Sequence, residues 1–502
     1  MGASLTRNSP PQAGMLIESL RGLGYTTATA LADIIDNAIP AGATQVNVLF
    51  HWAEGDSWIS VADNGKGMSD DELERAMQLG ARDPRDERLS DDLGRFGMGL
   101  KTASFSQART LTVASRPAKS EFNCLRWDLD ALENTASGDW PLLEGAAHGS
   151  LERLKLPDGS LSGTVVLWEK LDRIITDGFS GDDMMELMEQ VEAHLGMTFH
   201  RIIGKAAGQF ELTINEKRIV PWDPFMLGHL GKRLESTEYR LVGAPDVKVQ
   251  CHVLPHKDML GHDEAKVAAG PEGWSSQQGF YIYRNKRLLT IAGWLRLGER
   301  GRQWTKDEPH RLARIRLDIP NNVDGDWKIN VIKSTASPPV KLKPQLHRIA
   351  KETRETARSV FAYRGRLVEG QNGREGAVPD IWQAIRKTSG ATSYRLSREH
   401  DLYRSVIGRA GPLKKDIEAL LRLVEGTVPV QRIWLDTAEA DEPPVSNIDD
   451  EPDPILIDTM EAVFDALVHS SGLSEDEARA RLSKTRPFDK RPELVSQLKI
   501  KN

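Results

Sequence analysis

The first hundred residues contain, in this order, three short polar or glycine-rich segments: Asp33-Ile34-Ile35-Asp36-Asn37, Asp63-Asn64-Gly65-Lys66-Gly67 and Gly94-Arg95-Phe96-Gly97-Met98-Gly99. Asp63 lies 26 residues after Asn37, and Gly94 lies 27 residues after Gly67. A fourth element, Gly163-Thr164, precedes an apolar run that is typical of a strand. Each segment alone is weak evidence, because such motifs occur on many helices and turns. Their order and spacing together predict one nucleotide-binding site.

The pattern around the first segment predicts a helix over residues 26–39, ended by Pro40 and Gly42. Its apolar stripe is formed by Leu31, Ile34, Ile35 and Ala38. Asp33 and Asn37 are four residues apart, so their side chains share a face opposite that stripe. A second helix is expected over residues 100–106. Alternating patterns predict strands, the first two of them an antiparallel pair, at 45–50, 58–62, 109–115, 121–128 and 164–169.

These segments resemble the Bergerat ATP-binding site of the GHKL superfamily, which includes gyrase B, the ninety-kilodalton heat-shock chaperones, histidine kinases, MutL and the MORC ATPases. The resemblance covers about residues 15–345 and points most to prokaryotic MORC-like and MutL-like ATPases. It implies an α+β protein with a Bergerat-fold α/β sandwich ATPase domain, a β-α-β transducer domain and a mostly helical C-terminal region. The ligands that it implies are ATP and Mg²⁺.

The first segment supplies a carboxylate and an amide for phosphoryl transfer. In the family, the residue at Asp33 orients and deprotonates the attacking water, and the residue at Asn37 helps to bind Mg²⁺ through its amide oxygen, since Mg²⁺ prefers oxygen ligands. Family members usually have Glu where this chain has Asp33. Asp is shorter by one methylene, and a displacement of about 1 Å can cost roughly 100-fold in rate. We therefore expect slow hydrolysis, with Asp36 in a supporting structural role.

The second segment is expected to bind the base. The resemblance implies that the Asp63 carboxylate accepts a hydrogen bond from the adenine amino group, which selects adenine over guanine. Gly65 and Gly67 let the backbone turn close under the base, where a side chain would clash. Met68 then lines the base pocket, and Thr164 lies behind Asp63. The simpler interpretation of the segment by itself is a hairpin turn.

The third segment is expected to bind the phosphates. Gly94, Gly97 and Gly99 open a helix, whose backbone N–H groups and partial positive charge favour phosphate. Two better-known phosphate loops fail here: Leu100 separates Gly99 from Lys101, and Thr102 stands where a dinucleotide fingerprint needs glycine. The remaining cofactor-binding residues implied by the resemblance are Arg95, Phe96, Met98 and Lys101. The polar stretch 81–93 is expected to be a lid over ATP.

Lys333 is the candidate catalytic residue outside the first domain. It follows a strand that we expect over residues 327–332, and the resemblance implies that it reaches the γ-phosphate. A solvent-exposed lysine at a strand end is the alternative. The run Arg284-Asn285-Lys286-Arg287 is most simply a hairpin turn, and a basic loop that touches a partner or DNA is the other interpretation.

The length of 502 residues indicates about three domains. We expect the following division: an N-terminal arm at 1–15, the ATP-binding domain at 16–204, the transducer at 205–345, a helical or mixed region at 346–435, an acidic linker at 436–454 and a helical segment at 455–502. Two cysteines, no run of 18 apolar residues and an N-terminus without a secretory apolar core favour a reduced cytoplasmic setting without a membrane.

The net charge of −7 excludes a general polyanion binder, so DNA contact would need a local basic patch. One candidate, which a solvated helix face would also explain, contains Lys341, Lys343, Arg348, Lys351, Arg354, Arg358, Arg364 and Arg366. The resemblance implies an ATP-dependent homodimer that acts as a clamp, with double-stranded DNA and a nuclease or other defence-system protein as partners, in restriction or anti-phage (antiviral) defence. The alternatives are a heat-shock-type chaperone ATPase acting on protein clients, a histidine kinase and a catalytically idle binding module.

Overall fold

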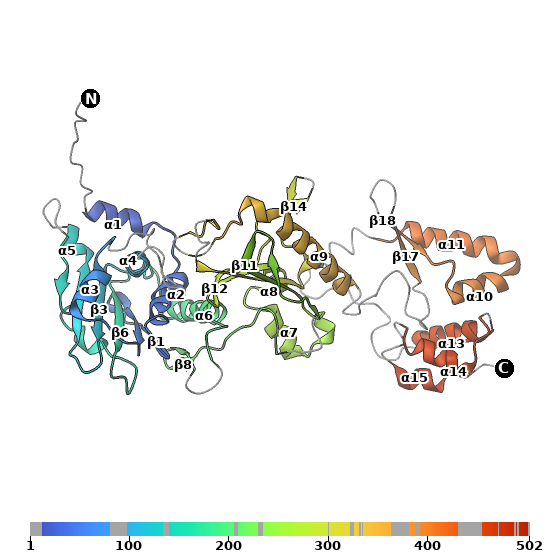
Figure 1. Cartoon of the computed structure of the whole chain (residues 1–502). Coiled ribbons are helices and arrows are strands. Elements are labelled where there is room, and N and C mark those ends of the chain that lie inside the picture. Colours follow the sequence, from blue (N-terminus) through green and yellow to red (C-terminus); the bar gives the residue numbers. More distant parts are fainter. Residues whose placement is uncertain are drawn as a thin grey trace, which may run out of the picture. The chain divides into compact units, whose positions relative to one another are not determined.

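The computed structural model describes residues 13–80, 98–133, 140–204, 209–228, 234–299, 301–321, 326–330, 333, 335–362, 381–386, 392–429, 454–469, 471–485, 488 and 491–499. The chain divides into two units, Met1–Gly365 and Arg366–Asn502 (Figure 1). The expected α+β fold is confirmed, because the first unit is built on two mixed sheets covered by helices.

The first sheet has eight strands in the order β5-β4-β3-β6-β2-β1-β7-β8. Neighbouring strands are antiparallel, except that β1 and β7 are parallel. The strands are β1 Gln45–His51, β2 Trp58–Asp63, β3 Thr110–Arg116, β4 Asn123–Asp128, β5 Leu143–Glu144, β6 Gly163–Glu169, β7 Glu211–Ile214 and β8 Lys217–Arg218. We expected the ATP-binding domain to end at residue 204, but β7 and β8 lie beyond that point and complete its sheet.

Helices bury one face of this sheet. They are α1 Ala13–Arg21, α2 Thr27–Ala38, α3 Asp70–Met77, α4 Gly99–Phe105, α5 Leu129–Glu133 and α6 Gly181–Thr198, with short 3₁₀ turns at η1 Glu54–Asp56 and η2 Leu151–Arg153. Side chains alternate across the sheet. Val61 and Trp168 therefore belong to the helix-covered core, whereas Ala62 and Leu167 belong to a smaller cluster on the opposite face, together with Leu154.

Helix α2, which carries the first motif, forms where the apolar spacing predicts it. Thr26 caps its N-terminus, and Thr29 completes a reciprocal capping box. Leu31 and Ile35 are fully buried against the sheet. Helix α6 begins at Gly181, where Ser180 caps its N-terminus, and ends at Thr198.

The second sheet follows the order β10-β11-β16-β12-β13, with β9 also pairing with β11. The strands are β9 Leu234–Glu235, β10 Tyr239–Leu241, β11 Ala244–Val253, β12 Gly279–Arg284, β13 Arg287–Thr290 and β16 Ala313–Ile319, and a separate ribbon pairs β14 Gly298–Glu299 with β15 Arg302–Gln303. The associated helices are η3 Lys257–Met259, α7 His262–Ala269, α8 Gly273–Ser276, η4 Glu308–His310, η6 Val340–Leu342 and α9 Lys343–Ala362.

Helix α9 packs one apolar face on β11 and β16. The opposite face of β12 buries Tyr281 and Tyr283 with Met197 at the end of α6, so the two sheets of the first unit share an apolar contact. Residues 346–362, which we expected to belong to the C-terminal region, are therefore part of the helix that covers the second sheet.

Residues 327–330, the described part of the strand expected over 327–332, do not form a strand. Trp327 and Lys328 lie in a turn, and the φ angles of Lys328 and Lys333 are 48° and 50°. Trp327 and Ile329 are buried, so the alternating apolar pattern comes from a loop anchored in the core.

The second unit contains a hairpin and two groups of helices. Its elements are β17 Trp382–Arg386, β18 Thr392–Leu396, α10 Asp401–Arg409, η7 Gly411–Leu413, α11 Lys414–Gly426, α13 Pro454–His469, α14 Glu475–Leu482 and α15 Pro492–Gln497. Its core joins α13, α14 and α15 through residues such as Met460, Phe464 and Leu482. Nearly all of the acidic linker expected at 436–454 lies outside the described residues. Across the described parts of the chain, no helix is long and apolar enough to span a membrane.

Candidate nucleotide site

Four oppositely charged side chains meet at the centre of the candidate site. Asp33 and Asp36 lie on α2, and the side chain of each is only 2% exposed. The Lys333 ammonium nitrogen is 2.9 Å from Asp33 Oδ1 and 2.6 Å from Asp36 Oδ2. Lys333 is itself buried, which contradicts the alternative of a solvent-exposed lysine. A residue 300 positions away in sequence thus contacts the candidate base.

Arg287 is the second cation of this cluster. Its Nε donates to Asp36 Oδ1 at 3.1 Å, and one of its terminal nitrogens lies 3.6 Å from Asp33 Oδ1. Sequence reasoning placed Arg287 in a hairpin turn or a basic loop, and the turn is present between β12 and β13. The contact with Asp36 was missed because nothing local in the sequence indicates that this arginine is buried.

The two aspartates differ in their remaining partners. Asp33 Oδ2 accepts a hydrogen bond from the Tyr25 hydroxyl at 2.8 Å. Burial alone would raise the pKa of Asp36, but the charges of Arg287 and Lys333 and their hydrogen bonds outweigh burial and hold it below its usual value. Asp36, from which we expected only structural support, is therefore held ionised by both cations.

Asn37 is exposed on the next turn of α2. Its side-chain nitrogen donates to the Asp33 carbonyl at 3.1 Å, which leaves its amide oxygen as the atom that can ligate a cation. Among the described residues, no group of three or more His, Cys, Asp or Glu side chains is arranged to hold a metal ion. Such a site fits Mg²⁺ that keeps water ligands and depends on substrate phosphates.

Asp63 ends β2 in a largely buried position. Burial raises the pKa of its carboxyl to about 6, although hydrogen bonds from the backbone N–H groups of Gly65 and Thr164 favour the ionised form. The Gly65 N–H lies 2.8 Å from Asp63 Oδ1. At neutral pH this carboxylate is an acceptor in a partly dry environment, which suits recognition of an amino group.

Backbone segments pack closely around Asp63. Gly67 has a φ angle of 71°, and a Cβ atom there would lie 2.1 Å from the Arg116 carbonyl oxygen. A Cβ on Gly163 would lie 2.0 Å from the Asp63 carbonyl oxygen. A side chain at Gly67 would push its loop away from the end of β3, and one at Gly163 would separate β6 from β2, so both glycines are required by the close approach of the chain.

Met68 and Thr164 are joined through one buried serine. The Ser115 hydroxyl accepts from the Met68 N–H at 2.8 Å and lies 2.8 Å from the Thr164 hydroxyl. Thr164 is paired with Asp63 in the β2–β6 ladder. The structure thus brings three predicted base-pocket residues, Asp63, Met68 and Thr164, together at one end of the sheet.

Of the predicted phosphate-binding residues, Met98, Gly99 and Lys101 are described, whereas Gly94, Arg95, Phe96 and Gly97 lie outside the described residues, as does the expected lid at 81–93. Gly99 begins α4 beside the catalytic candidate, since a Cβ there would lie 3.6 Å from Asp33 Oδ2. Lys101 is buried, and its amine donates to the Ala76 carbonyl at 2.7 Å. This bond connects α4 to α3, and a role for Lys101 toward phosphate stays a prediction.

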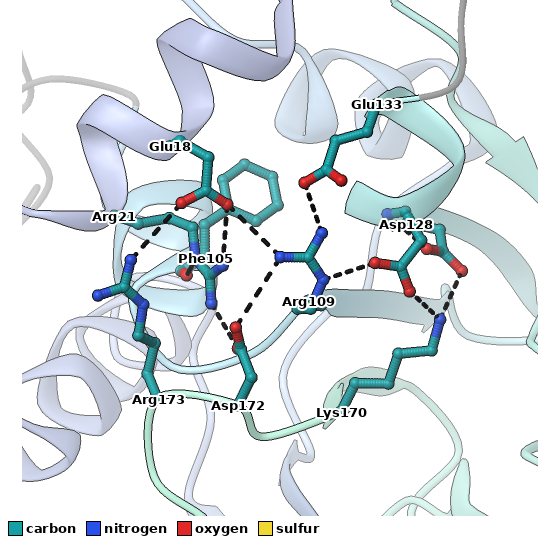
Figure 2. A network of polar contacts seen from close by, with 10 residues as sticks. Glu18, Arg21, Phe105, Arg109, Asp128, Glu133, Lys170, Asp172 and Arg173 are labelled. Atoms are coloured by element: carbon teal, nitrogen blue, oxygen red, sulfur yellow. Dashed lines mark hydrogen bonds and ion pairs between the residues drawn. The ribbon is translucent and has the colours of Figure 1, made fainter. Parts of the chain in front are cut away.

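A network of ion pairs fastens α1 to the far end of α4 (Figure 2). The side chain of Arg21 is 1% exposed, pairs with Glu18 and Asp172, and donates through Nε to the Phe105 carbonyl at 2.7 Å. Arg109 continues the network with contacts to Glu18, Asp130 and Glu133. Because Phe105 ends the helix that Gly99 begins, these contacts fix the position of α4 at the site.

The predicted basic patch is reduced in the structure. Arg354 is buried, with its guanidinium 4.5 Å from the ring of Trp294 and 4.9 Å from that of Trp304. Arg364 and Arg366 lie outside the described residues. The exposed members are Lys341, Lys343, Arg348, Lys351 and Arg358. Lys351 pairs with Glu299 at 2.9 Å.

Residues 25–159 match the family described as histidine kinase-, DNA gyrase B-, and HSP90-like ATPase. With the motifs and the sheet described above, this match shows that the chain carries a GHKL ATPase domain.

The chain is similar to proteins of two groups within this superfamily. It is 34% identical over 92 residues to protein MICRORCHIDIA 4 of Arabidopsis thaliana, covering 17% of this chain and 11% of the relative. It is 39% identical over 93 residues to the DNA mismatch repair protein MutL of Azorhizobium caulinodans, covering 18% and 14%. It is 28% identical over 88 residues to ATPase morc-1 of Caenorhabditis elegans, covering 18% of this chain and 10% of the relative. The matches thus span only a small part of each relative.

Proposed function

We propose that this protein binds ATP with Mg²⁺, hydrolyses it slowly, and uses the bound nucleotide to close a homodimeric clamp on double-stranded DNA. The observation that carries the proposal is the contact of Lys333 with Asp33. A cation that reaches the candidate base from the loop that follows the second sheet is placed to respond to a terminal phosphate. The matched ATPase family and the similarity to MutL and MORC proteins also support this proposal.

In the proposed reaction, Asp63 accepts a hydrogen bond from the adenine amino group while Met68 lines the base pocket. The α4 N-terminus at Gly99 then lies on the phosphate side, next to Asp33. Asn37 would hold Mg²⁺, which neutralises phosphate charge when bound. Asp33 orients the attacking water and takes its proton, and Lys333 stabilises the terminal phosphate.

The hydrogen bonds that Asp33 makes in the nucleotide-free protein favour slow turnover. Oδ1 accepts from Lys333 and Oδ2 accepts from Tyr25, so each oxygen already accepts a hydrogen bond from a group other than water. Lys333 must leave Asp33 before the carboxylate can act on water. Together with the shorter side chain of Asp, this step lowers the expected rate.

The nucleotide assignment is tested with three variants and one control. We expect Asp63→Asn and Asn37→Ala to weaken ATP binding by about tenfold or more, as loss of a charge-assisted or metal contact does. Asp33→Asn should retain ATP binding and lose phosphate release. Asp71→Asn, an exposed aspartate on α3, should behave as wild type. Unchanged ATP affinity in both Asp63→Asn and Asn37→Ala would refute the site.

The clamp is tested by mass measurement and by DNA stimulation. A non-hydrolysable ATP analogue should convert monomer to dimer in light scattering, because a ligand that prefers the closed state shifts the equilibrium toward it. Duplex DNA should stimulate phosphate release, and the stimulation should disappear as ionic strength rises. A protein that stays monomeric with the analogue and ignores DNA at low salt would contradict the clamp.

We place this clamp in restriction or anti-phage defence, with cleavage supplied by a separate nuclease. The support is the resemblance to prokaryotic MORC-like and MutL-like ATPases together with the exposed basic side chains on α9. Arg348→Glu with Arg358→Glu should reduce DNA stimulation severalfold while basal hydrolysis stays unchanged. Protection of cells from phage in the presence of the gene, and its loss with Asp33→Asn, would be the biological test.

A further inference from the structure

We infer that Arg287 is a positioning residue of the ATPase site: it stays paired with Asp36 when Lys333 leaves the two aspartates for the terminal phosphate. This inference rests on the proposed function, because it requires that Lys333 moves to a phosphate. It adds a residue of the second sheet to the site and assigns a role to Asp36.

The charge balance of the cluster is the first reason. Two carboxylates, Asp33 and Asp36, face two cations, Lys333 and Arg287. Neighbouring titratable groups add no charge near neutral pH. Burial, and secondarily the charge of Arg287, lowers the pKa of His194 to about 4, and burial together with the charge of Asp33 raises the pKa of Tyr25. The cluster is therefore neutral only while both cations are present.

The two cations use different oxygens of Asp36. Arg287 Nε donates to Oδ1 at 3.1 Å, whereas the Lys333 ammonium donates to Oδ2 at 2.6 Å. Departure of Lys333 therefore leaves the Arg287–Asp36 bond in place. It also frees Asp33 Oδ1, the oxygen that accepts from Lys333 at 2.9 Å. The cluster then carries one negative charge with Arg287 and two without it.

Arg287 is held in place independently of Lys333. It is the first residue of β13 and follows a tight turn in which Asn285 and Lys286 have φ angles of 48° and 68°. One of its terminal nitrogens donates to the Leu288 carbonyl at 2.9 Å. Its planar guanidinium is thus fixed by its own strand, whereas the Lys333 ammonium ends a flexible stem. The arginine is suited to stay and the lysine to move.

Arg287→Met is the principal test, with two measurements. Without Arg287, departure of Lys333 would leave two buried aspartates without a counter-ion, so Lys333 should remain on them. We expect kcat to fall by about tenfold or more, in the usual range of coupling between sites. The second measurement is the ratio of affinities for a non-hydrolysable ATP analogue and ADP by titration calorimetry, which reports the terminal phosphate alone. This ratio should fall by a similar factor.

Charge-balanced variants separate positioning from a structural role. Asp36→Asn combined with Arg287→Met leaves one aspartate and one lysine, so this double variant should recover most of the lost kcat. Asp36→Asn alone removes one of the carboxylates that compete with phosphate for Lys333, and the analogue-to-ADP affinity ratio should rise. The latter test holds even if Arg287→Met fails to fold.

Arg201→Met is the matched control. Arg201, after α6, forms an ion pair with Asp318 on β16, another contact between the two sheets but outside the site. This variant should keep the wild-type kcat and affinity ratio. The inference alone is overturned if wild type hydrolyses ATP and Arg287→Met has the same kcat and affinity ratio. It is also overturned if the kcat of the double variant is no higher than that of Arg287→Met, or if Asp36→Asn lowers the analogue-to-ADP affinity ratio. If wild type does not distinguish the analogue from ADP, the proposed function fails as well.

Discussion

Replacing Lys333 with methionine tests the buried cluster as a source of stability. The substitution removes a cation that lies 2.9 Å from Asp33 and 2.6 Å from Asp36. Removing one partner of a buried ion pair costs about 3–5 kcal/mol, because the other charge stays buried. Arg287 remains 3.1 Å from Asp36, so we expect the lower end, about 3 kcal/mol. The cluster lies in the unit Met1–Gly365, and with an unfolding entropy of about 2.1 cal/mol/K per residue this loss lowers the melting temperature by about 4 °C.

The assay is thermal unfolding of nucleotide-free protein followed by circular dichroism. Lys217→Met is the control, because Lys217 pairs with Glu192 at 2.8 Å but its side chain is 70% exposed; it should unfold at nearly the wild-type temperature. Lys333→Met combined with Asp36→Asn should recover most of the loss. A melting temperature for Lys333→Met equal to that of the control would refute the reasoning, as would a double variant less stable than the single one.

The stability lost in Lys333→Met should depend on pH in a defined direction. The pKa of Asp36 is lowered in the folded state, so its stabilising contribution is present above the unfolded-state value of about 4 and is lost as the pH falls through the lower folded-state value. The stability difference between wild type and Lys333→Met should therefore be largest at neutral pH and shrink in acid. A difference that grows below about pH 4 would contradict this assignment.

Three further predictions concern the base pocket and α1. The pKa of Asp63 is about 6, so ATP affinity should fall by about tenfold between pH 7.5 and pH 5 as the carboxyl becomes protonated, and Asp63→Asn should abolish that dependence in calorimetric titrations. Gly67→Ala should lower the free energy of unfolding, measured in urea, by more than about 2 kcal/mol, because its Cβ would lie 2.1 Å from the Arg116 carbonyl oxygen. The control is Gly178→Ala, which has open space around it and a φ angle of 87°, and it should lower this free energy by only about 1 kcal/mol. Arg21→Met should cost about 2 kcal/mol by leaving a buried carbonyl unpaired, and wild-type stability in that variant would show that the α1 network is dispensable.

The sequence by itself determined the features that depend on local pattern. The apolar spacing of Leu31 and Ile35 predicted α2, whose observed bounds Thr27–Ala38 lie within one residue of the expected helix. Alternation predicted β1 and β2 as an antiparallel pair. Asp63 could be assigned to a strand end beside two glycines, because a turn this tight needs them. Such signals are visible because neighbours in sequence are neighbours in these elements.

Only the tertiary structure decided which distant residues meet. Arg287 contacts Asp36 across 251 positions, and the parallel pairing of β7 with β1 extends the first sheet past its expected end. The sequence predicts a basic patch that includes Arg354, yet this residue is buried against two tryptophans. A charge on a helix or hairpin has the same local sequence pattern whether it faces solvent or a buried counter-ion. Its environment is set by the packing of segments far apart in the chain, so it can be assigned only once those segments are folded together.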